Sequence, residues 1–201
     1  MLILTSNGLS SDKLLNRVKV LVGSMKSAVI VTTASVGYKQ NDKHIPRLTE
    51  ELTMLDLSID FFDFDTDKPQ DLLNYDVIEL NGGNPFYLLK SIQQANCCDV
   101  LKKIVKNKIV IGISAGALIF QNSIELIYRY TPNLNDDVGL KDFSALNLTD
   151  IQILPHYHRF LKQFDNFEQT ALTYEKAKNI KLIRLDDGQG VIDSPKGYIL
   201  V

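Results

Sequence analysis

Short apolar runs alternate with amphipathic segments over about the first 115 residues, and this alternation constrains the fold more than any other feature. Short β-branched runs predict buried strands, and apolar residues at helical spacing predict helices that cover a sheet. The predicted strands are 2–5, 28–32, 59–64, 77–80 and 108–113, and the predicted helices are 11–25, 46–57, 69–73 and 85–106, the last interrupted near Asn96. This order favours an α/β fold of three layers, with a mostly parallel central sheet and helices on both faces.

The last third of the chain is less regular. Residues 123–150 contain turn signals and weak periodicity, so we expect a loop or a β excursion there. Beyond it, the pattern predicts strands at 151–154, 180–185, 190–193 and 198–201, and a helix at 164–178. We find no internal repeat and no linker-like tract in the sequence, and we therefore expect a single domain over residues 1–201.

Composition excludes several classes of protein. The chain has 201 residues, of which 45% are hydrophobic, and a formal net charge of −2, so it lacks the basic excess of nucleic-acid-binding proteins. Its apolar runs are far shorter than the roughly 20 residues of a membrane span. The only cysteines, Cys97 and Cys98, are adjacent and rarely pair in such an arrangement, which favours a reducing compartment. We expect a cytoplasmic protein without a nucleic-acid or membrane partner.

A serine stands between two glycines where the strand at 108–113 meets the next helix. The segment Gly112-Ile113-Ser114-Ala115-Gly116 has the G-x-S-x-G pattern of a nucleophile elbow. The glycines leave room for a tight turn, and the first N–H groups of the helix, Ala115 among them, would face an oxyanion formed at Ser114. The alternative interpretation is that Ser114 only caps the helix.

A nucleophilic serine needs a base, and the chain has three histidines. His156 follows the predicted strand at 151–154, and His158 would point to the same side if both residues were extended. We prefer His156 because it is closer to the end of the strand. His44 precedes Pro46 and is interpreted as a solvated residue at the start of a helix.

Paired glycines follow the strand at 77–80, in the segment Asn81-Gly82-Gly83-Asn84. The carboxyl ends of parallel strands meet at one edge of a sheet, which would bring this segment close to Ser114. Glycines let backbone N–H groups approach a ligand, so the segment is a turn, a phosphate cradle or an oxyanion hole. The neighbouring elbow favours the oxyanion hole.

Together these motifs resemble the dipeptidase E (aspartyl dipeptidase) family of serine peptidases, which includes cyanophycinase. The likeness rests on the Gly-Gly-Asn strand end and the two leucines after it at 81–89, the elbow at 112–117, and Gln-Ile-Leu-Pro-His at 152–156. The resemblance implies a flavodoxin-like fold similar to class I glutamine amidotransferases, with serine in place of their cysteine. It implies no metal and no organic cofactor.

The resemblance also implies roles for particular residues. Ser114 would be the nucleophile, His156 the general base, and the amides of Gly82, Gly83 and Ala115 the oxyanion hole. The third member of the triad orients the histidine. The segment 185–189 resembles the family's Leu-x-Glu-Gly motif after a strand, with aspartate in place of the family's glutamate. We favour Asp187 because a residue at the end of a strand is held more rigidly than one in a loop. The alternatives are Asp186, Glu125, Asp136 and Asp137.

The activity that the resemblance implies is hydrolysis of small peptides through an acyl-enzyme. Asn84 and Arg159 are the candidates for contact with substrate, and Arg159 or Lys162 would pair with a carboxylate. An amidase or esterase that acts on a non-peptide substrate is one alternative, and a catalytically inactive binding or regulatory relative is another. We expect a monomer or a homodimer.

Overall fold

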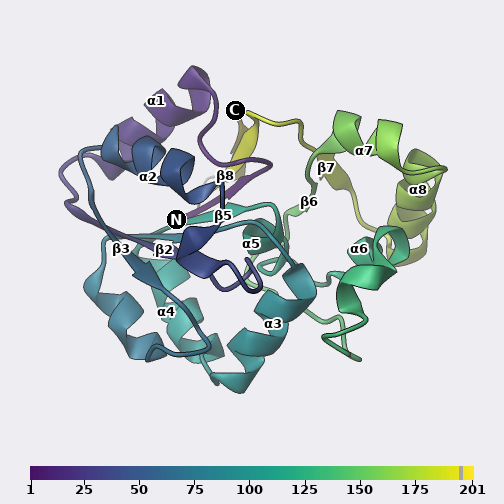
Figure 1. Ribbon diagram of the computed structural model, residues 1–201. Coiled ribbons are helices and arrows are strands. Elements are labelled where there is room, and N and C mark those ends of the chain that lie inside the picture. The colour runs from purple at the N-terminus through teal and green to yellow at the C-terminus, as the bar shows by residue number, and fades with distance from the viewer. Residues whose placement is uncertain (195–196) are drawn as a thin grey trace.

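The computed structural model describes residues 1–194 and 197–201, and at its centre is a seven-stranded sheet in the order β3-β2-β4-β5-β1-β8-β9 (Figure 1). Strands from β3 to β1 in this order run parallel, whereas β8 pairs antiparallel with both β1 and β9. The bounds are β1 (Leu2–Thr5), β2 (Ser27–Val31), β3 (Ser58–Phe62), β4 (Val77–Leu80), β5 (Ile109–Ile113), β8 (Gly190–Ser194) and β9 (Gly197–Leu200). The prediction of a mostly parallel central sheet is confirmed.

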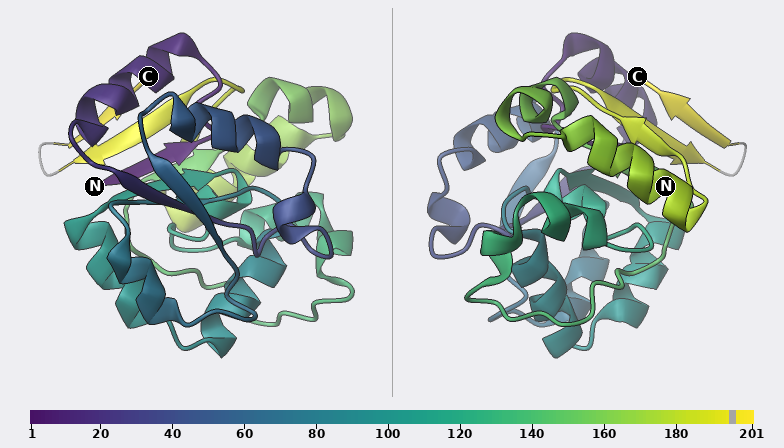
Figure 2. Two further views of the ribbon diagram at one scale, coloured as in Figure 1. Left: turned by 60° about the vertical axis from the view of Figure 1, so that its left-hand side comes forward. Right: turned by 90° about the vertical axis from the view of Figure 1, so that its right-hand side faces the viewer.

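Helices cover both faces of this sheet and complete the three layers that the sequence predicted (Figure 2). One face carries α1 (Asp12–Val22) and α2 (Ile45–Thr53), and the other carries α3 (Pro85–Gln94), α4 (Cys98–Asn107) and α5 (Ala115–Leu118). The 3-10 helices are η1 (Lys39–Asn41), η2 (Pro69–Asn74) and η3 (Pro132–Asn135). Within the described ranges, no helix is long and apolar enough to cross a membrane.

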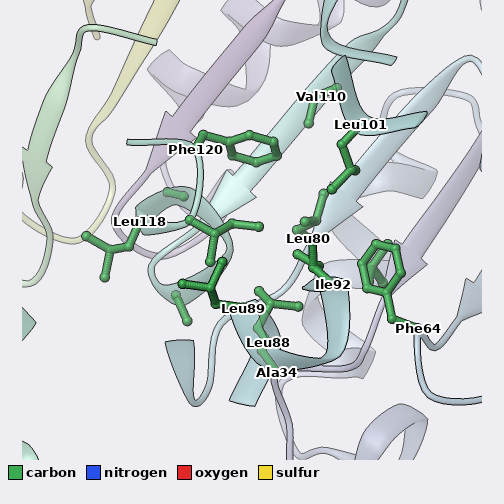
Figure 3. Close-up of a cluster of buried hydrophobic side chains, with 14 of the residues drawn as sticks. Ala34, Phe64, Leu80, Leu88, Leu89, Ile92, Leu101, Val110, Leu118 and Phe120 are labelled. Atoms are coloured by element: carbon green, nitrogen blue, oxygen red, sulfur yellow. The ribbon is translucent and has the colours of Figure 1, made fainter. Parts of the chain in front are cut away.

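Side chains of the buried strands alternate between the two faces, so each strand contributes to two cores. On β1, Leu2 and Leu4 pack into the core on the side of α3, α4 and α5, while Ile3 packs on the side of α1 and α2. Figure 3 shows part of the first core, where Leu80 of β4 lies beside Ile92 of α3. Burial of one such side chain contributes about 1.5–3 kcal/mol, so the strands that carry the site are firmly held.

Five elements lie to one side of the central sheet and form what we call the satellite unit (Figure 1). They are α6 (Glu125–Tyr130), β6 (Gln152–Leu154), α7 (Tyr157–Gln163), α8 (Phe167–Lys178) and β7 (Leu182–Arg184). β6 and β7 pair in parallel as a separate two-stranded sheet. The unit has its own small core, whose buried members are Leu126, Leu154, Phe167, Ala171, Tyr174 and Leu182.

Residues 123–150 differ from the expectation of a loop or a β excursion. This stretch contains α6 and η3, and over the described residues its strand-like pairing is a single bridge between Ser123 and Ser144. The β excursion was therefore wrong. At six residues, α6 is too short to present a helical period in the sequence. Burial of Leu126 and Ile127 stabilises it instead.

The other helices occur where they were predicted, but α1 ends at Val22 and α2 at Thr53, both before their predicted ends, and the helix predicted at 69–73 is the 3-10 helix η2. The interruption near Asn96 is confirmed, because α3 ends at Gln94, α4 begins at Cys98, and Asn96 has a φ of 50°. The helix expected at 164–178 begins at Phe167, and a further helix, α7, precedes it. The extended conformation considered for His158 is consequently wrong, since His158 lies in α7.

Candidate active site

Ser114 occupies the sharp turn between β5 and α5, with φ 48° and ψ −109°. A non-glycine residue rarely adopts such a conformation, and the strain is typical of a functional turn. A Cβ atom on Gly112 would lie 2.6 Å from Ala117 Cα, and one on Gly116 would lie 2.2 Å from Leu80 O, so the turn requires glycine on both sides. Among the described contacts, the Ser114 side chain makes no capping hydrogen bond to α5.

His156 lies two residues beyond β6, at the start of α7, and faces Ser114 from the satellite unit. Its Nε2 lies 3.0 Å from Ser114 Oγ, and its Nδ1 lies 2.5 Å from Asp187 Oδ1. The backbone is left-handed at φ 58°, which turns the ring back toward the central sheet. Burial lowers the pKa of His156 below its usual value, and the neighbouring Asp187 only partly offsets this effect. The ring is therefore neutral at neutral pH and able to accept a proton.

Asp187 follows β7 and completes a line of three side chains. Burial alone would raise the pKa of Asp187, but hydrogen bonds from His156 and Ser6 outweigh it and hold the pKa below its usual range. Ser6 Oγ donates to Asp187 Oδ1 over 2.9 Å, and Arg159 Nη1 lies 3.7 Å from Asp187 Oδ2. The carboxylate is thus ionised, as a partner of the His156 ring should be.

The other carboxylates considered for this role bind elsewhere. Asp186 accepts from the His158 backbone N–H at 2.9 Å and lies 2.5 Å from His158 Nδ1. Glu125 pairs with Arg129 and Lys178. Asp136 and Asp137 lie directly after η3. In the described part of the chain, neither forms a hydrogen bond with His156.

Gly82 and Gly83 line the same cavity as Ser114, and Ala115 directly follows Ser114. The backbone N–H groups of these three residues have no intramolecular partner among the described residues. Gly83 has φ 141°, and a Cβ there would lie 2.2 Å from Ala34 O, so this position admits only glycine. A Cβ on Gly82 would lie 3.5 Å from Ser114 Cβ, which places Gly82 beside the candidate nucleophile. Ala115 is the first residue of α5, where helix N–H groups point outward.

The two predicted substrate contacts differ in their surroundings. Asn84 caps α3, since its Oδ1 accepts from Phe86 N and Tyr87 N and its Nδ2 donates to Leu134 O. These bonds occupy both ends of the amide, and the contact of Asn84 with substrate stays a prediction. Arg159 lines the cavity above Ser114, with its guanidinium over the Phe160 ring.

A cavity of about 260 Å³ opens over the Ser114 hydroxyl. Three of its charged lining residues are cationic, Lys43, Arg47 and Arg159, and one is anionic, Asp42. His44, interpreted from the sequence as solvated, is exposed at this rim. Arg47 is held by Glu51 and by Asn7, to whose carbonyl and side-chain oxygens it donates at 3.1 Å.

Several lining residues escaped the sequence analysis, among them Asp42, Lys43, Arg47, Ser6 and Asn7. Ser6 and Asn7 are the two that a sequence rule could have found. They follow β1 at the carboxyl edge of the sheet, so the rule that pointed to Ser114 and to Gly82 and Gly83 also points to them. Neither belongs to a glycine-rich motif, and this is why the segment gave no other signal.

Comparison with known proteins adds independent information. A family model described as peptidase family S51 matches residues 2–196. An uncharacterized peptidase of Pasteurella multocida is 36% identical over 107 residues, which is 53% of this chain and 50% of the relative. Peptidase E of Shewanella oneidensis is 27% identical over 155 residues, which is 77% of this chain and 63% of that protein. The chain thus spans about half the length of the first curated relative that it matches.

Solved structures with the same fold include a candidate peptidase E from Listeria monocytogenes. It superposes with a TM-score of 0.76 at 23% identity, covering 100% of this chain and 96% of that one. A peptidase from an acI-B1 actinobacterium superposes with a TM-score of 0.74 at 17% identity, covering 100% and 86%. At these identities the likeness concerns the fold alone.

Proposed function

Because the chain belongs to peptidase family S51, we propose that it is a serine peptidase that hydrolyses small peptides through Ser114, His156 and Asp187. The observation that carries this proposal is the line of contacts from Ser114 Oγ to His156 Nε2 at 3.0 Å and from His156 Nδ1 to Asp187 at 2.5 Å. Nucleophile, base and orienting acid within hydrogen-bond distance are the requirements for nucleophilic acyl transfer.

The first half-reaction follows from these positions. Ser114 Oγ attacks the substrate carbonyl carbon while His156 Nε2 takes the hydroxyl proton, and Asp187 stabilises the resulting imidazolium. The carbonyl oxygen becomes an oxyanion, toward which the N–H groups of Ala115, Gly82 and Gly83 would donate. Collapse breaks the C–N bond, and His156 gives its proton to the leaving amine. The acyl group remains on Ser114.

Water completes the cycle by the same steps. His156, neutral again, takes a proton from a water molecule that attacks the acyl carbon. The tetrahedral intermediate collapses, Ser114 recovers its proton from His156, and the acid product leaves. A neutral His156 is required at both stages, and burial of the ring favours that state.

The cavity supports a small substrate. Its volume of about 260 Å³ is below the range of roughly 300–1,000 Å³ that is typical of sites for drug-sized ligands. The relatives named peptidase E support a peptide substrate, and the resemblance of the sequence to the dipeptidase E family implies one of dipeptide size. Arg159 at the wall is the residue that we assign to a substrate carboxylate.

A fluorophosphonate probe followed by a dipeptide library tests the proposal. We expect the probe to label the wild-type protein, and Ser114→Ala and His156→Ala to abolish or greatly reduce labelling. Ser123→Ala is the matched control, because Ser123 bonds to Phe143 O outside the cavity. An unlabelled wild-type protein would identify an inactive relative. A labelled protein that cleaves no dipeptide but cleaves simple esters or amides would favour the non-peptide alternative.

A further inference from the structure

Ser6 lies just beyond β1 and is completely buried, although the proposed reaction gives it no part. Its hydroxyl contacts both satellite residues of the proposed triad. Ser6 Oγ lies 2.9 Å from Asp187 Oδ1, 2.8 Å from the backbone nitrogen of His156 and 3.2 Å from His156 Nδ1. One side chain therefore contacts the base at two atoms and the acid at a third.

The donors and acceptors determine how these contacts are arranged. An ionised Asp187 only accepts, so the single hydroxyl proton of Ser6 goes to it. The backbone N–H of His156 only donates, so Ser6 Oγ accepts there. The remaining lone pair of Ser6 faces His156 Nδ1 and matches a ring that carries its proton on Nδ1. That tautomer leaves Nε2 free to accept from Ser114.

The same short segment also holds the nucleophile. The Thr5 carbonyl accepts from the Ser114 N–H at 2.9 Å, while the next residue, Ser6, binds His156 and Asp187. His156 has a left-handed backbone, which costs on the order of 1 kcal/mol or more in a non-glycine residue. The bond from its N–H to Ser6 stabilises this conformation. The end of β1 thus joins the central sheet to the satellite unit at the site.

We propose that Ser6 is a positioning residue, which docks His156 and Asp187 against Ser114 and keeps His156 in the tautomer that accepts the Ser114 proton. This role rests on the proposed function of the three residues. Because the Ser6 hydroxyl is occupied by His156 and Asp187, its loss affects the chemical step rather than substrate binding.

Ser6→Ala tests the role through two measurements: kcat and KM with the best dipeptide, and the rate of fluorophosphonate labelling between pH 5 and 9. We expect kcat and the labelling rate to fall roughly 10- to 100-fold, as for the loss of a hydrogen bond to a charged group, with KM unchanged. We also expect the acid limb of both profiles to move to higher pH. In the wild-type protein, the hydrogen bond from Ser6 partly offsets the negative charge of Asp187. Without it, the full charge of Asp187 favours the protonated His156 ring and raises the pKa of His156.

Ser11→Ala is the matched control for loss of a hydroxyl. Ser11 Oγ donates to Gly188 O at 2.6 Å, so it supports the same turn as Asp187 without a described contact to Asp187 or His156. This variant should lower the melting temperature at most and keep kcat and the acid limb. If Ser6→Ala does not fold, the same measurements are made on Ser6→Cys. Its thiol is of similar size to the hydroxyl and is a weak hydrogen-bonding group. It should show an intermediate loss.

The outcomes separate the two proposals. An unlabelled wild-type protein overturns the proposed function and, with it, the role of Ser6. A labelled wild-type protein together with folded Ser6 variants that react at the wild-type rate and with the wild-type acid limb overturns the role of Ser6 alone. The same holds if Ser11→Ala reproduces the loss and the shift of Ser6→Ala, since the effect would then arise from the turn as a whole.

Discussion

The central sheet and the satellite unit contribute to the candidate site in different ways. The central sheet carries Ser114 directly after β5, a strand that lies between two paired strands and between two large cores. The satellite unit carries His156 and Asp187 at the ends of β6 and β7, a two-stranded sheet with a small aromatic core. A small core buries less apolar surface and stabilises less. The proposed nucleophile is therefore held by the more stable part, while the proposed base and acid depend on the docking of the less stable part.

Charged contacts compensate for the small core of the satellite unit. Arg184 on β7 binds Glu168 and Glu175 of α8, with Nη2 to carboxylate distances of 2.8 and 2.9 Å. The Glu175 backbone carbonyl and side chain also bind residues that lead into β7. These contacts fix β7 against α8 and, through the chain, fix the turn that carries Asp187.

The largest effect expected from either region is that of Asp187→Asn. The asparagine keeps the shape but offers the wrong partner to His156 Nδ1, so kcat should fall by about 10⁴-fold, as in other serine triads. Steady-state kinetics on the best dipeptide measures this. Asp186→Asn is the matched control and should have a far smaller effect, because Asp186 binds His158. A wild-type rate for Asp187→Asn would move the acid to Asp186, Glu125, Asp136 or Asp137.

Phe167→Ala tests whether the satellite unit can be loosened separately. Phe167 is buried at the centre of the small aromatic core, and its truncation should cost about 3–5 kcal/mol of local stability. Hydrogen exchange should increase over residues 152–184, with a loss of activity, while β4 and β5 stay protected.

Leu89→Ala in the core of the central sheet is the comparison for that variant. It should lower the global free energy of unfolding by about 2–5 kcal/mol, yet keep the activity per folded molecule. If both variants loosen the same segments, the two regions are one cooperative unit and the contrast drawn above is wrong.

Glu79→Gln tests the buried carboxyl group of Glu79, which lies within the central sheet. Glu79 on β4 is fully buried, and its carboxyl oxygens have no hydrogen-bond partner among the described residues. Burial raises the pKa of Glu79 well above its usual value, and the nearby Glu51 adds to this. Its contribution to stability is complete below the usual glutamate pKa and is lost as pH rises through the folded-state value.

Urea unfolding at several pH values between 5 and 9 measures this contribution. Relative to Glu79→Gln, the wild-type protein should lose up to about 1.4 kcal/mol of unfolding free energy for each pH unit between the usual glutamate pKa and the raised folded-state pKa of Glu79, and no more above that folded-state pKa. Parallel stability curves for the two proteins would show that Glu79 is charged in the folded state or has a partner.

The smallest effect concerns the pH dependence set by the satellite unit. Burial lowers the pKa of His156, and the proposed base works only when neutral. The acid limb of kcat/KM should therefore have its midpoint below about 6.5, the usual value for histidine. His158→Ala should leave that midpoint in place, since His158 lies 2.5 Å from Asp186 on the exposed side. A midpoint at or above the usual value would mean that His156 is charged more readily than its burial implies.

Local features of the sequence were enough to predict the central sheet and the glycine-flanked turn at Ser114. Alternating apolar runs identify strands and helices because each element buries one face or stripe, and steric limits require Gly112 and Gly116 around Ser114. Asn96 and the paired glycines Gly82 and Gly83 likewise mark breaks through their own backbone preferences.

Only the tertiary structure decided how the site is assembled. Ser6 and His156 are 150 residues apart in sequence, and His156 and Asp187 are 31 apart, so no local pattern relates them. The helices α6 and α7 escaped prediction for the same reason, since short helices are stabilised by packing rather than by periodicity. The sequence by itself indicated the turn at Ser114, because the glycine-flanked serine between a strand and a helix is a local pattern, although the close approach of Gly116 to Leu80 O is a tertiary contact. Which histidine and which carboxylate lie in line with Ser114 was decided by the docking of the satellite unit, because that depends on contacts between distant segments.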